Sequence, residues 1–229
     1  VARVDESGVG IVNRAAIGAD GTKIYPQRYP AAGTPNAVVD LYVMDPLGEH
    51  QVKVDLGAEN DIYLARVDWS KDGKTLFVQR ESRDQKRLDL LAVDPATGAS
   101  KVILTETAKT WINLSNNFRA LPDGSFLWWS ERTGHGHLYR VQGDKWTTLT
   151  SGDWEVGDVI GLDAKHDLIW FTGNRETPLE HHVYSASLSG KGEIKLLTEA
   201  GWWNNGVMDG AASRIIVSRS NPSQPVQLY

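Results

Sequence analysis

Short apolar runs separated by turn residues recur along the whole chain, and no long stretch shows the 3.6-residue period of an amphipathic helix. Asp-Gly pairs at positions 20, 72, 123 and 209 mark turns. Aromatic-rich or β-branched runs stand at residues 75–78, 125–128, 167–171 and 214–217. Such runs bounded by turn residues are typical of strands. The pattern therefore predicts an all-β protein built from many short strands.

A second kind of strand, usually with a tyrosine at its centre, recurs at a long interval. It occurs at residues 41–43, 90–93, 138–141, 183–186 and 228–229, and positions 42, 91, 139, 184 and 229 are separated by 49, 48, 45 and 45 residues. A Leu-Thr pair followed by tryptophan recurs in the same units, at Leu104-Thr105, Leu149-Thr150 and Leu197-Thr198. Units of this length with about four strands each match the blades of a β-propeller.

We therefore predict a β-propeller of about four to five blades, each with four antiparallel strands. An immunoglobulin-type sandwich would show the turn signals without the long-period recurrence of three separate motifs. The sequence leaves open whether residues 1–4 close a ring or the blades form an open arc. In either case the nine tryptophans follow the blade period, which indicates packing between blades.

Composition and charge exclude several classes of function. The chain has 229 residues and a net charge of −5. This mild acidity argues against nucleic acid as a partner. The basic cluster from Arg80 to Arg87 is interleaved with acids, which favours a solvated loop. No apolar run approaches the roughly 20 residues that span a bilayer. Because the first residue is Val1, we expect a processed or excised piece of a longer protein.

Few residues form a pattern that carries chemistry. Gly-x-Ser-x-Gly, Walker and paired-glycine phosphate motifs are absent, so no catalytic residue and no cofactor are predicted. The pairs His135/His137 and His181/His182 lack a third ligand at a suitable spacing, and we interpret them as solvated turn histidines without a metal. The carboxylate pairs Asp5-Glu6 and Glu176/Glu180 are interpreted as surface turns.

Several blocks of sequence carry a resemblance to a known family. They are residues 2–7, 28–36, 68–73, 82–86, 109–113, 130–139 and 152–156, and the most specific is the Tyr-Pro-x-Ala-Gly type block that begins at Tyr29. Together they resemble the propeller domain of dipeptidyl peptidase IV-like serine peptidases, in the prolyl oligopeptidase family. The resemblance runs from end to end, and the style of the sequence is bacterial.

The resemblance implies an eight-bladed propeller followed by a C-terminal α/β-hydrolase domain with a Ser-Asp-His triad. Members release N-terminal Xaa-Pro or Xaa-Ala dipeptides, and a pair of glutamates binds the free amine of the peptide. Both the hydrolase domain and that pair fall outside this chain, and Asp5-Glu6 matches a different family position. Residues 1–229 therefore resemble about half of the ring, and we expect the chain alone to be inactive.

The resemblance also implies a site and partners. An aromatic-Arg pair faces the substrate cleft in the family, and Phe118-Arg119 aligns with it, with Trp111 as support. The alternative for these residues is a packed loop aromatic beside a solvated arginine. The implied partners are a peptide with a free N-terminus, the parent's own hydrolase domain and a second copy of the parent. A periplasmic or secreted location is expected, with the cytoplasm left open.

Two rival functions remain. One is a non-catalytic propeller that acts as a scaffold or ligand-binding module. The other is an acylaminoacyl or oligopeptidase specificity, which would not need the glutamate pair.

Overall fold

Every regular element of the computed structural model, which describes all 229 residues, is a β-strand. The chain forms two compact units, Val1–Ile112 and Asn113–Tyr229, and each is described by itself. Neighbouring strands within each sheet are antiparallel and mostly consecutive in the sequence. The predicted all-β fold is confirmed.

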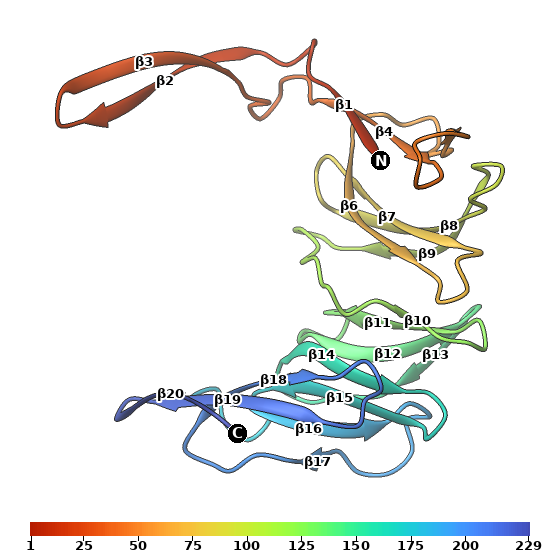
Figure 1. Cartoon of the computed structure of the whole chain (residues 1–229), viewed down its shortest axis with the longest axis vertical. Helices are drawn as coiled ribbons and strands as arrows, with labels where there is room; N and C mark the ends of the chain where they lie inside the picture. The colour runs from red at the N-terminus through yellow and green to blue at the C-terminus, as the bar shows by residue number, and fades with distance from the viewer. The chain divides into compact units, whose positions relative to one another are not determined.

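The first unit contains two sheets and one separate hairpin (Figure 1). One sheet has the order β1 (Ala2–Asp5), β4 (Val38–Val43) and β5 (Val52–Lys53). The other has the order β6 (Ile62–Trp69), β7 (Leu76–Ser82), β8 (Arg87–Val93) and β9 (Ser100–Thr107). Figure 1 shows β2 (Ile11–Gly18) and β3 (Gly21–Arg28) leaving this unit as a long two-stranded ribbon.

Apolar side chains between these two sheets form the core of the first unit. Alternate residues of a strand point to one face, so Leu76 and Val78 of β7 lie on the same side. They pack with partners from the first sheet and the segment after it, including Leu41, Val54 and Leu56. Full burial of each such side chain contributes about 1.5–3 kcal/mol, which holds the two sheets together.

The hairpin is the one part of the first unit that the repeat did not predict. All sixteen residues of β2 and β3 are exposed. The Asp20-Gly21 turn therefore closes this hairpin and does not belong to a blade. Among its exposed residues are Ile11, Ile17 and Ile24.

The second unit contains three sheets in chain order (Figure 1). The first comprises β10 (Arg119–Ala120), β11 (Phe126–Ser130), β12 (His137–Gln142) and β13 (Lys145–Thr148). The second comprises β14 (Val156–Asp163), β15 (Leu168–Gly173), β16 (His182–Ser187) and β17 (Lys195–Leu196). The third comprises β18 (Trp203–Met208), β19 (Ile215–Asn221) and β20 (Gln224–Leu228).

Trp154 is central to the core of the second unit. Its ring stacks on Phe171 at 6.3 Å between centroids and lies 6.0 Å from the ring of Tyr184. Leu127 and Leu138 of the preceding sheet belong to the same buried cluster. The predicted packing of a tryptophan between neighbouring blades is thereby confirmed for this residue.

The sheets agree with the predicted blades. Three sheets have four strands, and a three-stranded sheet stands at each end of the chain. The tyrosine-type segments form the third strands β8, β12 and β16 of the complete sheets, as well as β4 and the end of β20.

One hydrogen bond recurs in the four-stranded sheets, between the third strand and either the fourth strand or the residues just after it. It joins a polar residue of the third strand to the threonine of the Leu-Thr pair. The pairs are Asp89 Oδ1 with Thr105 Oγ1 at 2.6 Å, His137 Nδ1 with Thr150 Oγ1 at 3.1 Å, and His182 Nδ1 with Thr198 Oγ1 at 3.0 Å. We call this contact the strand lock.

The strand lock corrects the interpretation of the histidines. His137 and His182 are both 0% exposed, so the expectation of solvated turn residues was wrong for them. Their other ring nitrogens are also engaged: His137 Nε2 lies 2.9 Å from Gly152 O and His182 Nε2 lies 2.9 Å from Glu180 Oε2. Burial of the ring is possible because both nitrogens have partners.

The prediction of a solvated loop from Arg80 to Arg87 was wrong for Arg80 and Arg83, whereas residues 84–87 are exposed as predicted. Arg80 lies in β7, and its guanidinium donates to Asp89 Oδ2 at 2.7 Å. Arg83 donates to Tyr63 Oη at 2.7 Å and to Pro30 O at 3.0 Å. The second carboxylate pair lies in the turn segment between β15 and β16, as predicted. Glu176 is exposed and accepts a hydrogen bond from the Tyr184 hydroxyl at 2.9 Å, and Glu180 Oε2 lies 2.9 Å from His182 Nε2. The first pair, Asp5-Glu6, is exposed as expected.

Candidate functional site

Phe118 and Arg119 stand where the segment after Asn113 enters strand β10. Phe118 is 5% exposed and packs on Phe126, with 5.7 Å between the ring centroids. The Arg119 guanidinium donates to three backbone carbonyls, those of Asn116, Phe118 and Val159. Both side chains are therefore occupied within the second unit, in an arrangement close to the packed alternative. Their predicted proximity to substrate stays a prediction.

Trp111 has a different environment from that pair. It belongs to the first unit and is 60% exposed. The backbone around it is held to the turn between β7 and β8, because Ala108 N donates to Lys86 O and Ile112 N donates to Gln85 O. A large aromatic side chain on an anchored segment offers contact area for a ligand at low entropic cost.

Asn117 is a residue that the sequence reasoning missed. It is 3% exposed, its Nδ2 donates to Gly157 O at 2.6 Å, and its Oδ1 accepts from Val159 N at 2.7 Å. One side chain thus joins the entry of β10 to β14 of the next sheet. Asparagine suits this position because its amide carries both a donor and an acceptor. The sequence signal for this role was weak, because the two adjacent residues Asn116 and Asn117 both precede Phe118 and the local pattern does not distinguish them.

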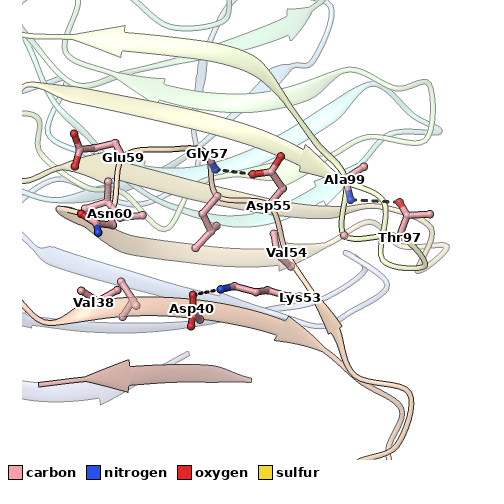
Figure 2. Close-up of a pocket in the computed structure, with 14 residues that line it drawn as sticks. Val38, Asp40, Lys53, Val54, Asp55, Gly57, Glu59, Asn60, Thr97 and Ala99 are labelled. Atoms are coloured by element: carbon pink, nitrogen blue, oxygen red, sulfur yellow. Dashed lines mark hydrogen bonds and ion pairs between the residues drawn. The ribbon is translucent and has the colours of Figure 1, made fainter. Parts of the chain in front are cut away.

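A pocket of about 620 Å³ lies in the first unit (Figure 2). Strand β4 forms one side, the segment from Val54 to Ile62 forms the other, and the turn at Thr97 to Ala99 closes one end. Figure 2 shows Asp40 on β4 and Asp55 on the segment across from it. This turn approaches closely, because Asp55 N donates to Gly98 O at 2.8 Å.

Three carboxylates and one ammonium group line this pocket. Asp40 Oδ1 lies 2.7 Å from Lys53 Nζ, and this hydrogen bond raises the pKa of Lys53 above its usual value. Asp55 Oδ1 accepts from Gly57 N at 2.9 Å, and Glu59 Oε1 accepts from Asp61 N at 2.9 Å. The pocket is therefore acidic, and its only cation is already paired.

The family to which the fold belongs follows from comparison with known proteins. The family described as "Dipeptidyl peptidase IV (DPP IV) N-terminal region" matches residues 1–226. Repeated four-stranded antiparallel sheets define the class as a β-propeller. The chain belongs to the dipeptidyl peptidase IV N-terminal region family.

Individual relatives agree with this assignment. The chain is 26% identical to dipeptidyl peptidase 8 of Mus musculus, over 98% of this chain and 33% of the relative. The crystal structure of Porphyromonas gingivalis dipeptidyl peptidase 4 superposes with a TM-score of 0.86 at 24% identity, over 99% of this chain and 33% of that one. At this identity the superposition shows the fold alone. The chain spans about a third of the length of these relatives.

The structure contains no helix long and apolar enough to cross a membrane.

Proposed function

We propose that this chain is the substrate-gating propeller portion of a serine-type dipeptidyl peptidase that releases N-terminal Xaa-Pro or Xaa-Ala dipeptides. The observation that carries the proposal is the family match over residues 1–226, whose relatives are named dipeptidyl peptidases. The chain corresponds to a third of the relative's length. On this proposal the triad and the amine-binding glutamates lie in other parts of the parent. The role of these blades is to admit extended peptide ends and to exclude folded proteins.

Trp111, Phe118 and Arg119 are the residues of this chain that we propose lie near the substrate. Trp111 supplies exposed aromatic surface. Phe118 and Arg119 act as positioning residues, since their side chains are occupied by Phe126 and by backbone carbonyls. On this proposal Trp111 is the side chain that contacts the peptide directly.

Variants of the full-length parent test this assignment. Trp111→Ala should lower kcat/KM for an Ala-Pro chromogenic substrate about fivefold or more, while the melting temperature stays within about 2 °C, because the side chain is exposed. Leu47→Ala removes another exposed apolar side chain and serves as the control. Unchanged kcat/KM in Trp111→Ala, with the same result in Arg119→Ala, would reject the proposed site.

Phe118→Ala separates two interpretations of this residue, proximity to the substrate and packing alone. If Phe118 lies near the substrate, kcat/KM should fall by a larger factor than the loss of stability explains. A lowered melting temperature with normal kinetics would assign Phe118 to packing alone.

The parent is also proposed to form a homodimer. The exposed isoleucines of the β2–β3 hairpin support this, since contiguous exposed apolar side chains often mark contact surfaces. Light scattering on the full-length parent measures its mass, and a monomer at micromolar concentration would reject the dimer.

A further inference from the structure

Two asparagines occupy equivalent positions in the first and third sheets of the second unit. The first strand of each sheet ends at a turn that a backbone hydrogen bond closes, with Leu121 N as donor at 2.8 Å after β10 and Asp209 N as donor at 3.1 Å after β18. Asn117 lies four residues before Leu121, and Asn205 lies four residues before Asp209. Each of the two is also preceded by another asparagine. Both side chains therefore stand at the same place relative to their sheets.

Asn117 shows what an amide at this position can bind. It donates to Gly157 O at 2.6 Å and accepts from Val159 N at 2.7 Å. Both partners are backbone groups of β14, which is the edge strand of the sheet β14–β17. An edge strand has backbone groups that its own sheet leaves unpaired. The amide carries a donor and an acceptor, so it can bind a carbonyl and the N–H two residues later whatever side chains the strand has.

Asn205 lies on the face of the third sheet that points away from the sheet β14–β17. The opposite face packs on that sheet (Figure 1): Asn204 Nδ2 donates to His181 O at 2.8 Å, and a Cβ atom at Gly206 would lie 2.7 Å from the side chain of Ile160. Successive side chains of a strand point to opposite faces, so Asn205 cannot reach the sheet β14–β17. Its side chain is exposed and makes neither of the contacts that Asn117 makes.

Leu127 and Ile216 are equivalent apolar side chains on the two faces that carry these asparagines. Each belongs to the second strand of its sheet and pairs with the residue two positions after the asparagine. Leu127 is 0% exposed and belongs to a buried cluster with Phe171 of the sheet β14–β17, whereas Ile216 is 59% exposed. On the same side as Ile216, Val207 is 72% and Trp203 is 49% exposed. A neighbouring sheet covers the first face, so a further sheet is the occupant that fits the second.

We propose that Asn205 is a binding residue for the edge strand of a further antiparallel sheet. Its amide donates to one backbone carbonyl of that strand and accepts from the N–H two residues later, while the sheet covers Trp203, Val207 and Ile216. The occupant is a segment of the parent outside these 229 residues, since the chain spans 33% of the length of its relative from Mus musculus. The identity of the occupant rests on the proposed function, because it assumes a longer parent.

Thermal unfolding of the 229-residue chain and of the full-length parent tests the proposal. In the chain, Asn205→Ala should leave the melting temperature within about 1 °C, because the side chain is exposed. In the parent, the same variant should lower it by about 4 °C or more, because two buried hydrogen bonds are lost. Asn117→Ala is the matched control and should lower the melting temperature of both proteins. An unchanged melting temperature of the Asn205→Ala parent would overturn the proposal.

Thiol labelling measures directly whether this face is covered. The 229-residue chain has no cysteine, so Val207→Cys introduces a single reactive site in it. A maleimide should label this site quickly in the chain and about tenfold or more slowly in the parent, because reaction there requires local opening. Leu47→Cys, at a side chain that is 84% exposed, should react equally fast in both.

Two results of the labelling would contradict the proposal. Equal labelling rates of Val207→Cys in the chain and the parent would show that no sheet covers this face. Slow labelling of the parent that becomes fast on dilution would assign the face to a second copy. Peptidase activity is measured on the same preparations, and an inactive parent with slow labelling would reject the proposed function while leaving the role of Asn205 intact.

Discussion

Thr150 is the residue whose replacement tests the strand lock most directly. Its hydroxyl accepts a hydrogen bond from Leu138 N at 2.9 Å and lies 3.1 Å from His137 Nδ1. His137 Nε2 faces the carbonyl oxygen of Gly152, which can only accept, so in the neutral ring Nε2 carries the proton and Nδ1 accepts from Thr150. Thr150→Val keeps the shape of the side chain and removes the hydroxyl.

The magnitude follows from the groups left without partners. Leu138 N and His137 Nδ1 belong to residues that are 0% exposed, so water cannot replace the lost contacts. An unsatisfied buried donor or acceptor costs about 1–3 kcal/mol, and the added methyl group returns a fraction of that. We expect Thr150→Val to lower the free energy of unfolding by about 2–4 kcal/mol.

Urea denaturation monitored by tryptophan fluorescence gives this free energy, since Trp154 lies in the same core. The corresponding fall in melting temperature is roughly 4–16 °C for a chain of this size. Thr150→Ser keeps the hydroxyl and should lose only about 1 kcal/mol, the value of one methyl group. If Thr150→Val were as stable as Thr150→Ser, the strand lock would not contribute as described.

Other consequences of the structure can be measured in the same way. Asn117→Ala removes the contacts to Gly157 O and Val159 N and should lower the free energy of unfolding by about 2–4 kcal/mol. The control Asn205→Ala, on the exposed surface, should lower it by less than about 0.5 kcal/mol. Equal losses in the two variants would reject the role of Asn117. Glu81 is 2% exposed with no partner for Oε1, and burial raises its pKa. The folded state therefore holds this proton to higher pH than the unfolded state does, so stability falls as pH rises from about 4.5 through the raised pKa. Glu81→Gln should remove this loss, and its stability relative to the wild type, followed by urea denaturation from pH 4 to 8, should increase with pH; a constant difference would contradict the effect.

The blade architecture was predictable because the residues that recur in the sequence are the ones whose side chains pack in the core. Tyr139 and Tyr184 lie in third strands at the predicted interval, and Trp154 is buried between sheets. Each recurring residue occupies an equivalent position in its sheet, so the period of the sequence motif equals the period of the sheets along the chain. The family resemblance stated from the sequence blocks is confirmed by the match over residues 1–226.

Features that depend on pairing across strands were not predictable from local pattern. His137 looks like a turn residue beside Gly134 and Gly136, yet Thr150, thirteen residues later, supplies the partner that permits its burial. Arg80 was assigned to solvent because acids surround it in the sequence, although its partner is Asp89 on the next strand.

The candidate sites show the same limit. Nothing in the sequence around Phe118 marks it as buried, because its packing partner Phe126 lies on the following strand. The absence of a strand lock between Asp40 and Asp55 in the first sheet becomes visible only when these residues are compared with the lock positions of the other sheets. That comparison needs the register of the strands, which the backbone hydrogen bonds provide.

Hydrolysis of an Ala-Pro or Gly-Pro chromogenic substrate tests the central claim most directly. The purified 229-residue chain and its full-length parent are assayed side by side at equal concentration. We predict that the parent releases the chromophore and that the chain alone does not, because the chain corresponds to the N-terminal region of the family. Robust hydrolysis by the chain alone, or an inactive parent that folds normally, would contradict the account.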